Sequence, residues 1–193
     1  MKKAIRIIGI AIICIGLIVG YYYYLSHRDK KNVENSTEVS KVDEVLSREL
    51  DQDYPPTPRE VVKFYNKILK CFYNEEYSDD EMQKLAEQAR LLMDDALLAN
   101  NPKEQYLALL KSDIQNAKDK GKFISDTKVE NSSDIEYQKV KGDECAYVTA
   151  SYFVKEGNSY TRTYEEYVLR KDTNKQWKIL GYQLAKGESS DEQ

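Results

Sequence analysis

An uncharged, apolar run begins the chain behind a short basic head. The run extends from Ile7 to Leu25, includes four consecutive tyrosines near its end, and follows three basic residues within the first six positions. As a helix it would span about 28 Å, close to the hydrocarbon thickness of a bilayer. Tyrosines are also enriched where a membrane helix meets the interface. The pattern predicts a transmembrane signal anchor over residues 1–25, with residues 4–25 in contact with membrane lipid.

Two alternatives stay open for this segment. A cleaved signal peptide would have small residues at the cleavage site, whereas bulky tyrosines stand there. A lipid-modified Cys14 would follow a small residue, whereas Ile13 precedes it. Because a basic head stays inside, we expect a single-pass protein of the cell membrane with a cytoplasmic N-terminus. The rest of the chain is then extracytoplasmic, in a bacterial cell envelope, although three basic residues after the anchor weaken the charge asymmetry.

A polar linker is expected over residues 26–56. One stretch within it has apolar residues at helical spacing, which predicts a short helix. These residues are Val39, Val42, Val45, Leu46 and Leu50. The pair Pro55-Pro56 ends the pattern, because proline disfavours helix in the residue before it.

Three further helices are predicted, and each begins with a capping sequence. A side chain that can accept from free amides is followed three residues later by glutamate. The capping sequences are Thr57-Pro58-Arg59-Glu60, Ser78-Asp79-Asp80-Glu81 and Asn101-Pro102-Lys103-Glu104. The predicted helices cover residues 58–74, 79–99 and 102–120, and each carries an apolar stripe of the kind that faces a core. Gly121 is placed to end the third.

After Gly121 the apolar spacing changes from the helical period to the strand period. Residues 123–140 predict either one irregular strand or two short ones. Further strands are predicted at Cys145–Lys155, Tyr160–Lys171 and Trp177–Leu184, with Gly157-Asn158 as a hairpin turn. We therefore expect one α+β domain over residues 57–187, with three helices packed on a curled, mostly antiparallel sheet. The acidic residues 188–193 are predicted to be disordered.

Neither face of the predicted sheet is plainly polar. Large apolar residues stand at both alternating positions of the strand 145–155, whereas a sheet with one solvated face alternates strictly. The helices cover one face, and two interpretations of the other stay open. Its tyrosine hydroxyls either simply reach water or belong to a protein contact surface. The residues of this candidate interaction face are Tyr147, Tyr164, Tyr167 and Tyr182.

The order of elements over residues 57–185 resembles the NTF2-like cone fold, also called the cystatin-like or ketosteroid-isomerase-like fold. The stretch NKQWKILGY, Asn174–Tyr182, is similar to the closing strand of that superfamily. The whole layout, with YYYYL, YPPTPREVVKFYNKILKCFYNEEY and TYEEYVLRK, resembles an uncharacterised family of small bacterial membrane-anchored proteins. An anchor followed by an external NTF2-like domain also resembles components of conjugation machines. The resemblance implies three helices around a curled sheet whose interior can hold a ligand.

Charge and residue types exclude several classes of function. The chain carries 33 acidic and 29 basic residues, a net charge of −4, and an acidic domain repels nucleic-acid phosphates. The single histidine, His27, lies beside the anchor, so the domain lacks a histidine for a catalytic triad or a zinc site. Paired CxxC, phosphate-loop and dinucleotide motifs are absent from the sequence. We therefore predict no catalytic residue, cofactor or metal, and no nucleic-acid partner.

Two acidic residues and two cysteines are ambiguous. In isomerases of the cone fold a buried aspartate acts as base beside a tyrosine, and the resemblance makes Asp94 or Asp95 the candidate here. Alternatively, both lie on the polar side of the helix 79–99. Cys71 and Cys145 either pair in a disulfide or stay free as buried apolar residues.

Two functions from different classes follow from these observations. The first, which we favour on sequence, is a non-enzymatic interaction or assembly module of the envelope, acting as a homodimer or with another envelope protein. The second is a small-ligand receptor, or more remotely an isomerase-like enzyme, that uses the cone interior. A filled cone with an exposed aromatic sheet face would favour the first. A tyrosine-lined cavity between helices and sheet would favour the second.

Overall fold

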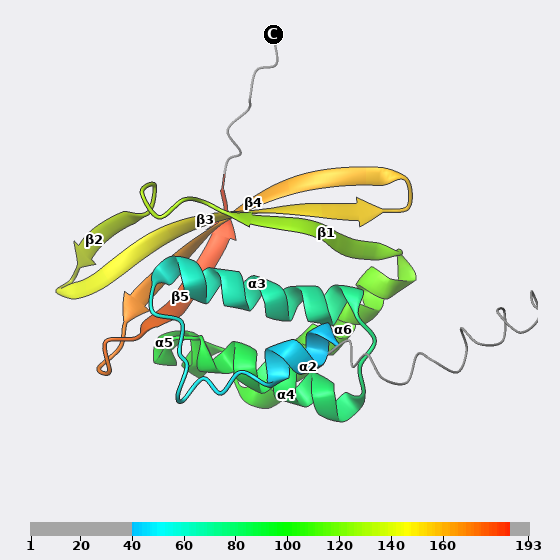
Figure 1. The fold of residues 1–193 in the computed structure, drawn as a ribbon, viewed down its shortest axis with the longest axis horizontal. Coiled ribbons are helices and arrows are strands. Elements are labelled where there is room, and N and C mark those ends of the chain that lie inside the picture. Colours follow the sequence, from blue (N-terminus) through cyan, green and yellow to red (C-terminus); the bar gives the residue numbers. More distant parts are fainter. Residues whose placement is uncertain (1–39, 186–193) are drawn as a thin grey trace, which may run out of the picture. The chain divides into compact units, whose positions relative to one another are not determined.

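The computed structural model describes residues 40–185. The predicted anchor over residues 1–25 and the predicted tail over residues 188–193 lie outside the described residues. Within residues 40–185, no helix is long and apolar enough to cross a membrane. The described part contains five helices followed by five strands in one antiparallel sheet (Figure 1). The α+β class and the curled antiparallel sheet are therefore confirmed.

The compact domain begins at Ser40, earlier than the expected boundary at residue 57. Helix α2, Lys41–Leu46, starts where the Ser40 side chain accepts a hydrogen bond from the Asp43 amide. Val42 and Val45 of this helix are buried in the domain core, together with Leu50. The short helix predicted in the linker therefore belongs to the domain, because burial of its apolar side holds it against α3 and α4.

Helix α3, Pro58–Asn74, has the predicted bounds and lies at the centre of the domain. It packs against β1, β3 and β5 on one side and against α4 on the other (Figure 1). Thr57 caps it by accepting from the Glu60 amide. At the next helix, Ser78 and Glu81 form the full reciprocal capping box, so the second predicted helix start is also confirmed.

The predicted long helix 79–99 is wrong, because the chain breaks it into α4, Asp79–Leu91, and α5, Asp95–Asn100. The connecting residues pair with the last strand instead of continuing the helix. The Ile179 amide donates to the Leu92 carbonyl and the Asp94 amide donates to the Ile179 carbonyl, both at 2.8 Å. The Asp94 side chain then caps α5. This pairing joins residues far apart in sequence, so helical spacing could not show it.

Helix α6, Lys103–Asp119, follows, and its predicted cap is also wrong. Pro102 is the capping position and makes no side-chain hydrogen bond. The Asn101 side chain instead donates to the Leu97 carbonyl at 2.9 Å, at the end of α5. Gly121 adopts φ +59° after α6, the left-handed conformation that glycine accepts readily, as predicted.

The region 123–140 forms two strands rather than one. The strands are β1, Lys122–Val129; β2, Glu136–Val140; β3, Asp143–Glu156; β4, Ser159–Lys171; and β5, Trp177–Leu184. The order is β1-β3-β4-β5, with β2 also paired to β3. The β3–β4 hairpin turns at Gly157-Asn158, where Glu156 pairs with Ser159, as predicted.

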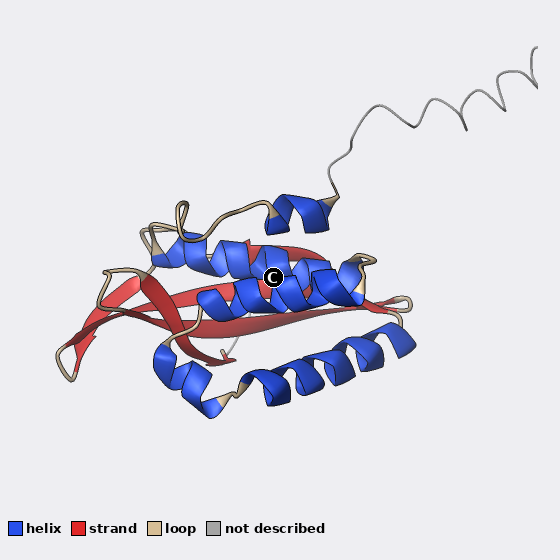
Figure 2. Ribbon diagram, turned by 90° about the horizontal axis from the view of Figure 1, so that it is seen from below, coloured by secondary structure: helices blue, strands red, loops and turns tan. Residues whose placement is uncertain are grey.

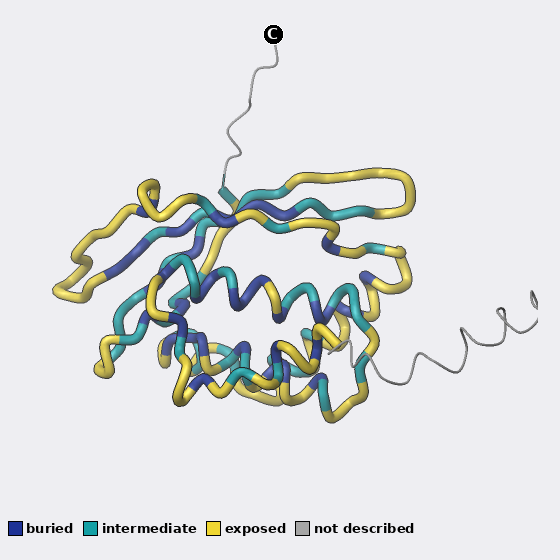
Figure 3. The backbone as a smooth tube through the Cα atoms, viewed as in Figure 1, coloured by how far each residue is buried: buried dark blue, intermediate teal, exposed yellow. Residues whose placement is uncertain are grey.

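The helices cover one face of the sheet, which we call the inner face (Figure 2). Its residues on β3 are buried and pair with alternate residues of β4. The pairs are Ala146 with Leu169, Val148 with Tyr167, Ala150 with Glu165, and Tyr152 with Thr163. The burial of the central strands and of α3 is visible in Figure 3. The opposite side, which includes Tyr147, Phe153, Arg162 and Tyr164, is the outer face.

Candidate functional site: a tyrosine-lined cavity

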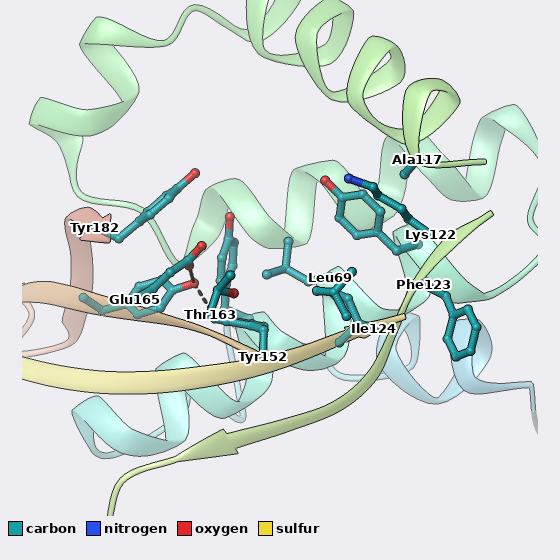
Figure 4. Close-up of a pocket in the computed structure, with 13 residues that line it drawn as sticks. Leu69, Ala117, Lys122, Phe123, Ile124, Tyr152, Thr163, Glu165 and Tyr182 are labelled. Carbon is teal, nitrogen blue, oxygen red and sulfur yellow. Dashed lines mark hydrogen bonds between the residues drawn. The ribbon is translucent and has the colours of Figure 1, made fainter. Parts of the chain in front are cut away.

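A cavity of about 220 Å³ lies between α3, the end of α6 and the inner face of the sheet (Figure 4). Five tyrosines from four elements line it, together with one carboxylate, Glu165. The tyrosines are Tyr65 and Tyr73 of α3, Tyr152 of β3, Tyr167 of β4 and Tyr182 of β5. Tyr182 is 57% exposed, so the cavity opens to solvent on that side.

The periods of helix and strand bring these side chains together. Tyr65, Leu69 and Tyr73 are four residues apart along α3 and therefore share one side of the helix. On β4, Thr163, Glu165 and Tyr167 are two residues apart and share the inner face. Figure 4 shows Glu165, Thr163 and Tyr182 pointing into the space below α6. The helical spacing on α3, the two-residue spacing on β4 and the pairing of the strands together place these side chains around one cavity.

A continuous chain of hydrogen bonds, which we call the polar chain, runs along the cavity wall. It consists of Asn66, Tyr152, Tyr167 and Glu165. The Tyr152 hydroxyl lies 2.6 Å from Asn66 Oδ1 and 2.6 Å from the Tyr167 hydroxyl. The Tyr167 hydroxyl lies 2.8 Å from Glu165 Oε2. The chain joins a buried amide on α3 to a carboxyl group at the cavity.

Burial changes the acidity of these groups in one direction. Desolvation raises the pKa of Tyr65, Tyr152 and Tyr167 above the usual value of a tyrosine. Desolvation also raises the pKa of the Glu165 carboxyl, against the lowering effect of the hydrogen bond from Tyr167. The tyrosines therefore stay neutral at physiological pH, and Glu165 holds its proton to a higher pH than a solvated glutamate.

The rings are packed by edge and tilted contacts. Tyr65 meets Tyr167 edge-on, with ring centroids 6.0 Å apart. Tyr167 and Tyr182 are 5.4 Å apart at an interplanar angle of 33°. Such contacts fix ring orientations and add to the stabilisation from burial. The walls of the cavity are therefore held in place before any ligand enters.

The comparison with protein families adds one finding. A family described as a domain of unknown function, DUF6715, matches residues 1–182. The chain belongs to the DUF6715 family. Its match begins at the first residue and includes both the apolar N-terminal run and every residue of the polar chain. No curated protein matches the chain.

The DUF6715 domain divides the predicted tyrosine face between two surfaces. Tyr147 and Tyr164 lie on the outer face, whereas Tyr167 and Tyr182 pair with one another on the inner face. Tyr167 is fully buried. The prediction of one four-tyrosine surface is therefore wrong. Residues three apart in a strand always point to opposite faces, so the spacing of Tyr164 and Tyr167 already contained this signal.

Neither aspartate considered as a base lies at the cavity of the DUF6715 domain. Asp94 is buried, but Arg170 donates to both of its carboxylate oxygens, at 2.6 and 3.0 Å. Asp95 is exposed in the first turn of α5. The structure thus gives Asp94 a structural ion pair and leaves Asp95 in solvent. The carboxyl group that does contact the tyrosines is that of Glu165, which the sequence analysis did not identify. Glu165 is four residues from Leu169 on the same strand, so both side chains point to the core face, and this spacing could have identified it.

Cys71 and Cys145, the two cysteines among residues 40–185, are free and buried. Cys71 lies on α3, and its thiol is 3.5 Å from the Lys41 carbonyl of α2. Burial raises the pKa of the Cys71 thiol to about 11, so it stays protonated. Cys145 lies on β3. Of the two alternatives, the structure shows buried thiols rather than a disulfide.

The outer face carries an aromatic cluster of its own. The Arg162 guanidinium lies 4.8 Å from the ring centre of Phe153 and 4.7 Å from that of Tyr164. Cation–π stacking of this kind holds the three side chains together.

Within residues 40–185, no group of histidine, cysteine or acidic residues is arranged to hold a metal ion.

Proposed function

We propose that this protein is a membrane-anchored, extracytoplasmic receptor domain that binds a small molecule in the tyrosine-lined cavity. The observation that carries the proposal is the cavity itself, with five tyrosines and Glu165 around about 220 Å³. Sequence alone favoured an interaction module, which a filled interior would support. Large side chains do fill the region around α4, but the space beside Tyr65, Tyr73 and Tyr182 stays open.

The size and lining of the cavity suit a small ligand. A cavity of about 150 Å³ can hold one benzene molecule, so this one has room for roughly ten non-hydrogen atoms. Binding sites combine apolar walls with a few polar groups that orient the ligand. Here the rings supply the walls, and Glu165, Thr163 and the tyrosine hydroxyls supply the polar groups.

Two sequence features support the rest of the proposal. The element order resembles the NTF2-like cone, in which the concave side of the sheet forms a pocket against the helices. The apolar run of residues 7–25 favours an anchor, and the family match includes it. A receptor that is held at the membrane with its pocket outside would sample small molecules of the envelope.

Filling the cavity should abolish ligand binding. Thr163→Phe places a ring into the cavity from the inner face. We expect native mass spectrometry of the full chain, purified in mild detergent, to show a small non-protein mass on the wild type that is lost in this variant. Thr149→Phe is the matched control, because Thr149 pairs with Glu166 on the outer face. A wild type without extra mass, or a Thr163→Phe variant that keeps it, would contradict the proposal.

A second candidate function rests on the outer face. Its cluster of Phe153, Arg162 and Tyr164 is not covered by any helix of the described part (Figure 1). We propose a second copy of the chain as the partner, because aromatic residues and arginine are enriched at the centres of protein interfaces.

Tyr164→Lys should dissociate such a dimer, since a second charge beside Arg162 repels it and removes the stacked ring. The measurement is the molar mass of the full chain in detergent by light scattering. Tyr137→Lys, at an exposed tyrosine of β2, is the control. A monomeric wild type at all concentrations, or a Tyr164→Lys dimer, would reject this candidate.

A further inference from the structure

We propose that the ligand of the cavity is a small organic cation, and that the ionised carboxylate of Glu165 is its counter-ion. This inference rests on the proposed ligand-binding function and names the class of ligand. It follows from three observations, which are the charge balance of the lining, the aromatic walls, and the number of hydrogens in the polar chain.

When it is ionised, Glu165 gives the cavity a negative charge that no cation of the lining neutralises. Glu165 is the one carboxylate among the described residues that line it, and Lys122 is the one cation. The Lys122 amine is already paired, since it lies 3.1 Å from Glu156 Oε2. Burial raises the pKa of Tyr73 and Tyr182, and the negative charge of Asp113 on α6 adds to this rise. A bound cation would balance this charge, whereas an anion would be repelled.

The walls suit a cation as well. Aromatic rings attract cations through the negative charge of their faces, and several rings around one carboxylate form a cage for amines or quaternary ammonium groups. Tyr65, Tyr167 and Tyr182 are held at fixed angles to one another beside Glu165. The site would therefore bind an organic cation by its apolar surface and its charge together.

The polar chain contains one hydrogen too few for its contacts. Three short contacts join Asn66, Tyr152, Tyr167 and Glu165, but the two hydroxyls supply only two hydrogens. A third must come from one end. Either Glu165 is protonated and donates to Tyr167, or the Asn66 amide turns over and its Nδ2 donates to Tyr152. Asn66 Nδ2 has no hydrogen-bond partner within residues 40–185, so it is free to do so.

These two arrangements correspond to two states of the cavity. In the empty site below the raised pKa of Glu165, the carboxyl group holds its proton, and every hydrogen bond of the chain points toward Asn66. When a cation enters, Glu165 loses its proton to solvent, and every hydrogen bond points toward the carboxylate. The Asn66 amide turns over and the hydroxyl hydrogens reorient, while the tyrosine rings stay in place. Binding of the cation is thus linked to release of a proton.

Glu165 is the group that titrates in this exchange. The charged and titratable groups facing it come from all the elements around the cavity. They are Tyr65 and Tyr73 of α3, Tyr106 and Asp113 of α6, Lys122 of β1, Tyr152 of β3, Tyr167 of β4 and Tyr182 of β5. Burial raises the pKa of all six tyrosines, including that of Tyr106 to about 12. A carboxyl group with a raised pKa is protonated as the pH falls, so affinity for a cation should fall with it.

The test compares choline with its neutral isostere 3,3-dimethylbutan-1-ol by calorimetric titration of the full chain in detergent. We expect choline to bind at least about tenfold more tightly at about pH 7.5, and to lose much of this advantage at about pH 5. At about pH 5, where Glu165 is at least partly protonated, titration in two buffers of different ionisation enthalpy should show proton release. Glu165→Gln should remove both the preference and the pH dependence. Glu166→Gln, on the outer face beside Gln183, should change neither.

Three outcomes would overturn the inference. If the neutral probe binds as tightly as choline, the ligand class is wrong. If the neutral probe binds the wild type but not the Thr163→Phe variant, the cavity still binds a ligand and the proposed function stands. If neither probe binds, the cation is rejected, and the native mass of the wild type decides the proposed function separately. A choline affinity that survives Glu165→Gln would reject Glu165 as the counter-ion.

Discussion

Replacing Phe72 by alanine is expected to lower the free energy of unfolding by about 4 kcal/mol. Phe72 is fully buried on α3, and its ring meets Tyr77 edge-on at 6.4 Å. Truncation removes the transfer free energy of the ring and leaves a space that tightly packed neighbours cannot fill. Urea unfolding followed by the fluorescence of Trp177, the chain's single tryptophan, measures the change.

Phe123→Ala is the matched control for this substitution. Phe123 stands on β1 with its ring 38% exposed, so its removal should cost less than about 1 kcal/mol. Equal losses in the two variants would mean that Phe72 does not pack as the structure shows.

Arg170→Ala is expected to destabilise the domain by about 2 kcal/mol. The substitution leaves the Asp94 carboxylate, 4% exposed, without the two hydrogen bonds that now pair it. A buried carboxylate without its partner costs several kcal/mol, but the arginine side chain is 30% exposed, so water can reach part of the gap. The loss should appear in the same urea experiment.

Asp143→Asn separates this ion pair from the neighbouring one. Asp143 is the second partner of Arg170, at 3.2 Å, and its side chain is 53% exposed. Exposed pairs contribute little, so we expect a change below about 0.5 kcal/mol. If Asp143→Asn were as harmful as Arg170→Ala, the junction between α4, α5 and β5 would depend on the surface pair instead of on Asp94.

The Arg170–Asp94 pair also explains why the junction forms at all. Asp94 accepts from Arg170 and from the Ala96 amide, while its own amide donates to Ile179. One residue thus starts α5 and joins β5, and Arg170 neutralises its buried charge. A helix continued through this position would lose the pairing with Ile179 and the cap that starts α5.

The interior of the domain is partly filled and partly open. Phe64, Phe72, Leu92 and Met93 are buried. The open space lies toward the end of α6, where Ala117 presents only a methyl group opposite Leu69 and Thr163 (Figure 4). The small side chain of Ala117 on α6 leaves this space open, and the large residues of α4 do not extend into it.

The sequence by itself determined the local elements. The Thr57 and Ser78 caps, the apolar stripe of α3 and the Gly157-Asn158 turn act over a few residues, so their patterns predicted α3, the start of α4 and the β3–β4 hairpin. The α+β class followed from the change of period after Gly121, since that change depends only on neighbouring residues.

Only the tertiary structure decided where the helix after Ser78 ends and which side chains meet at the cavity. The break at Leu92–Asp94 requires β5, and the burial of Val42 and Val45 requires α3 and α4. Asn66 and Glu165 are joined through Tyr152 and Tyr167 because the register pairs Val148 with Tyr167 and places α3 over them. Register and helix packing are set by contacts between distant segments, and periodicity along the chain carries no information about which distant segments touch.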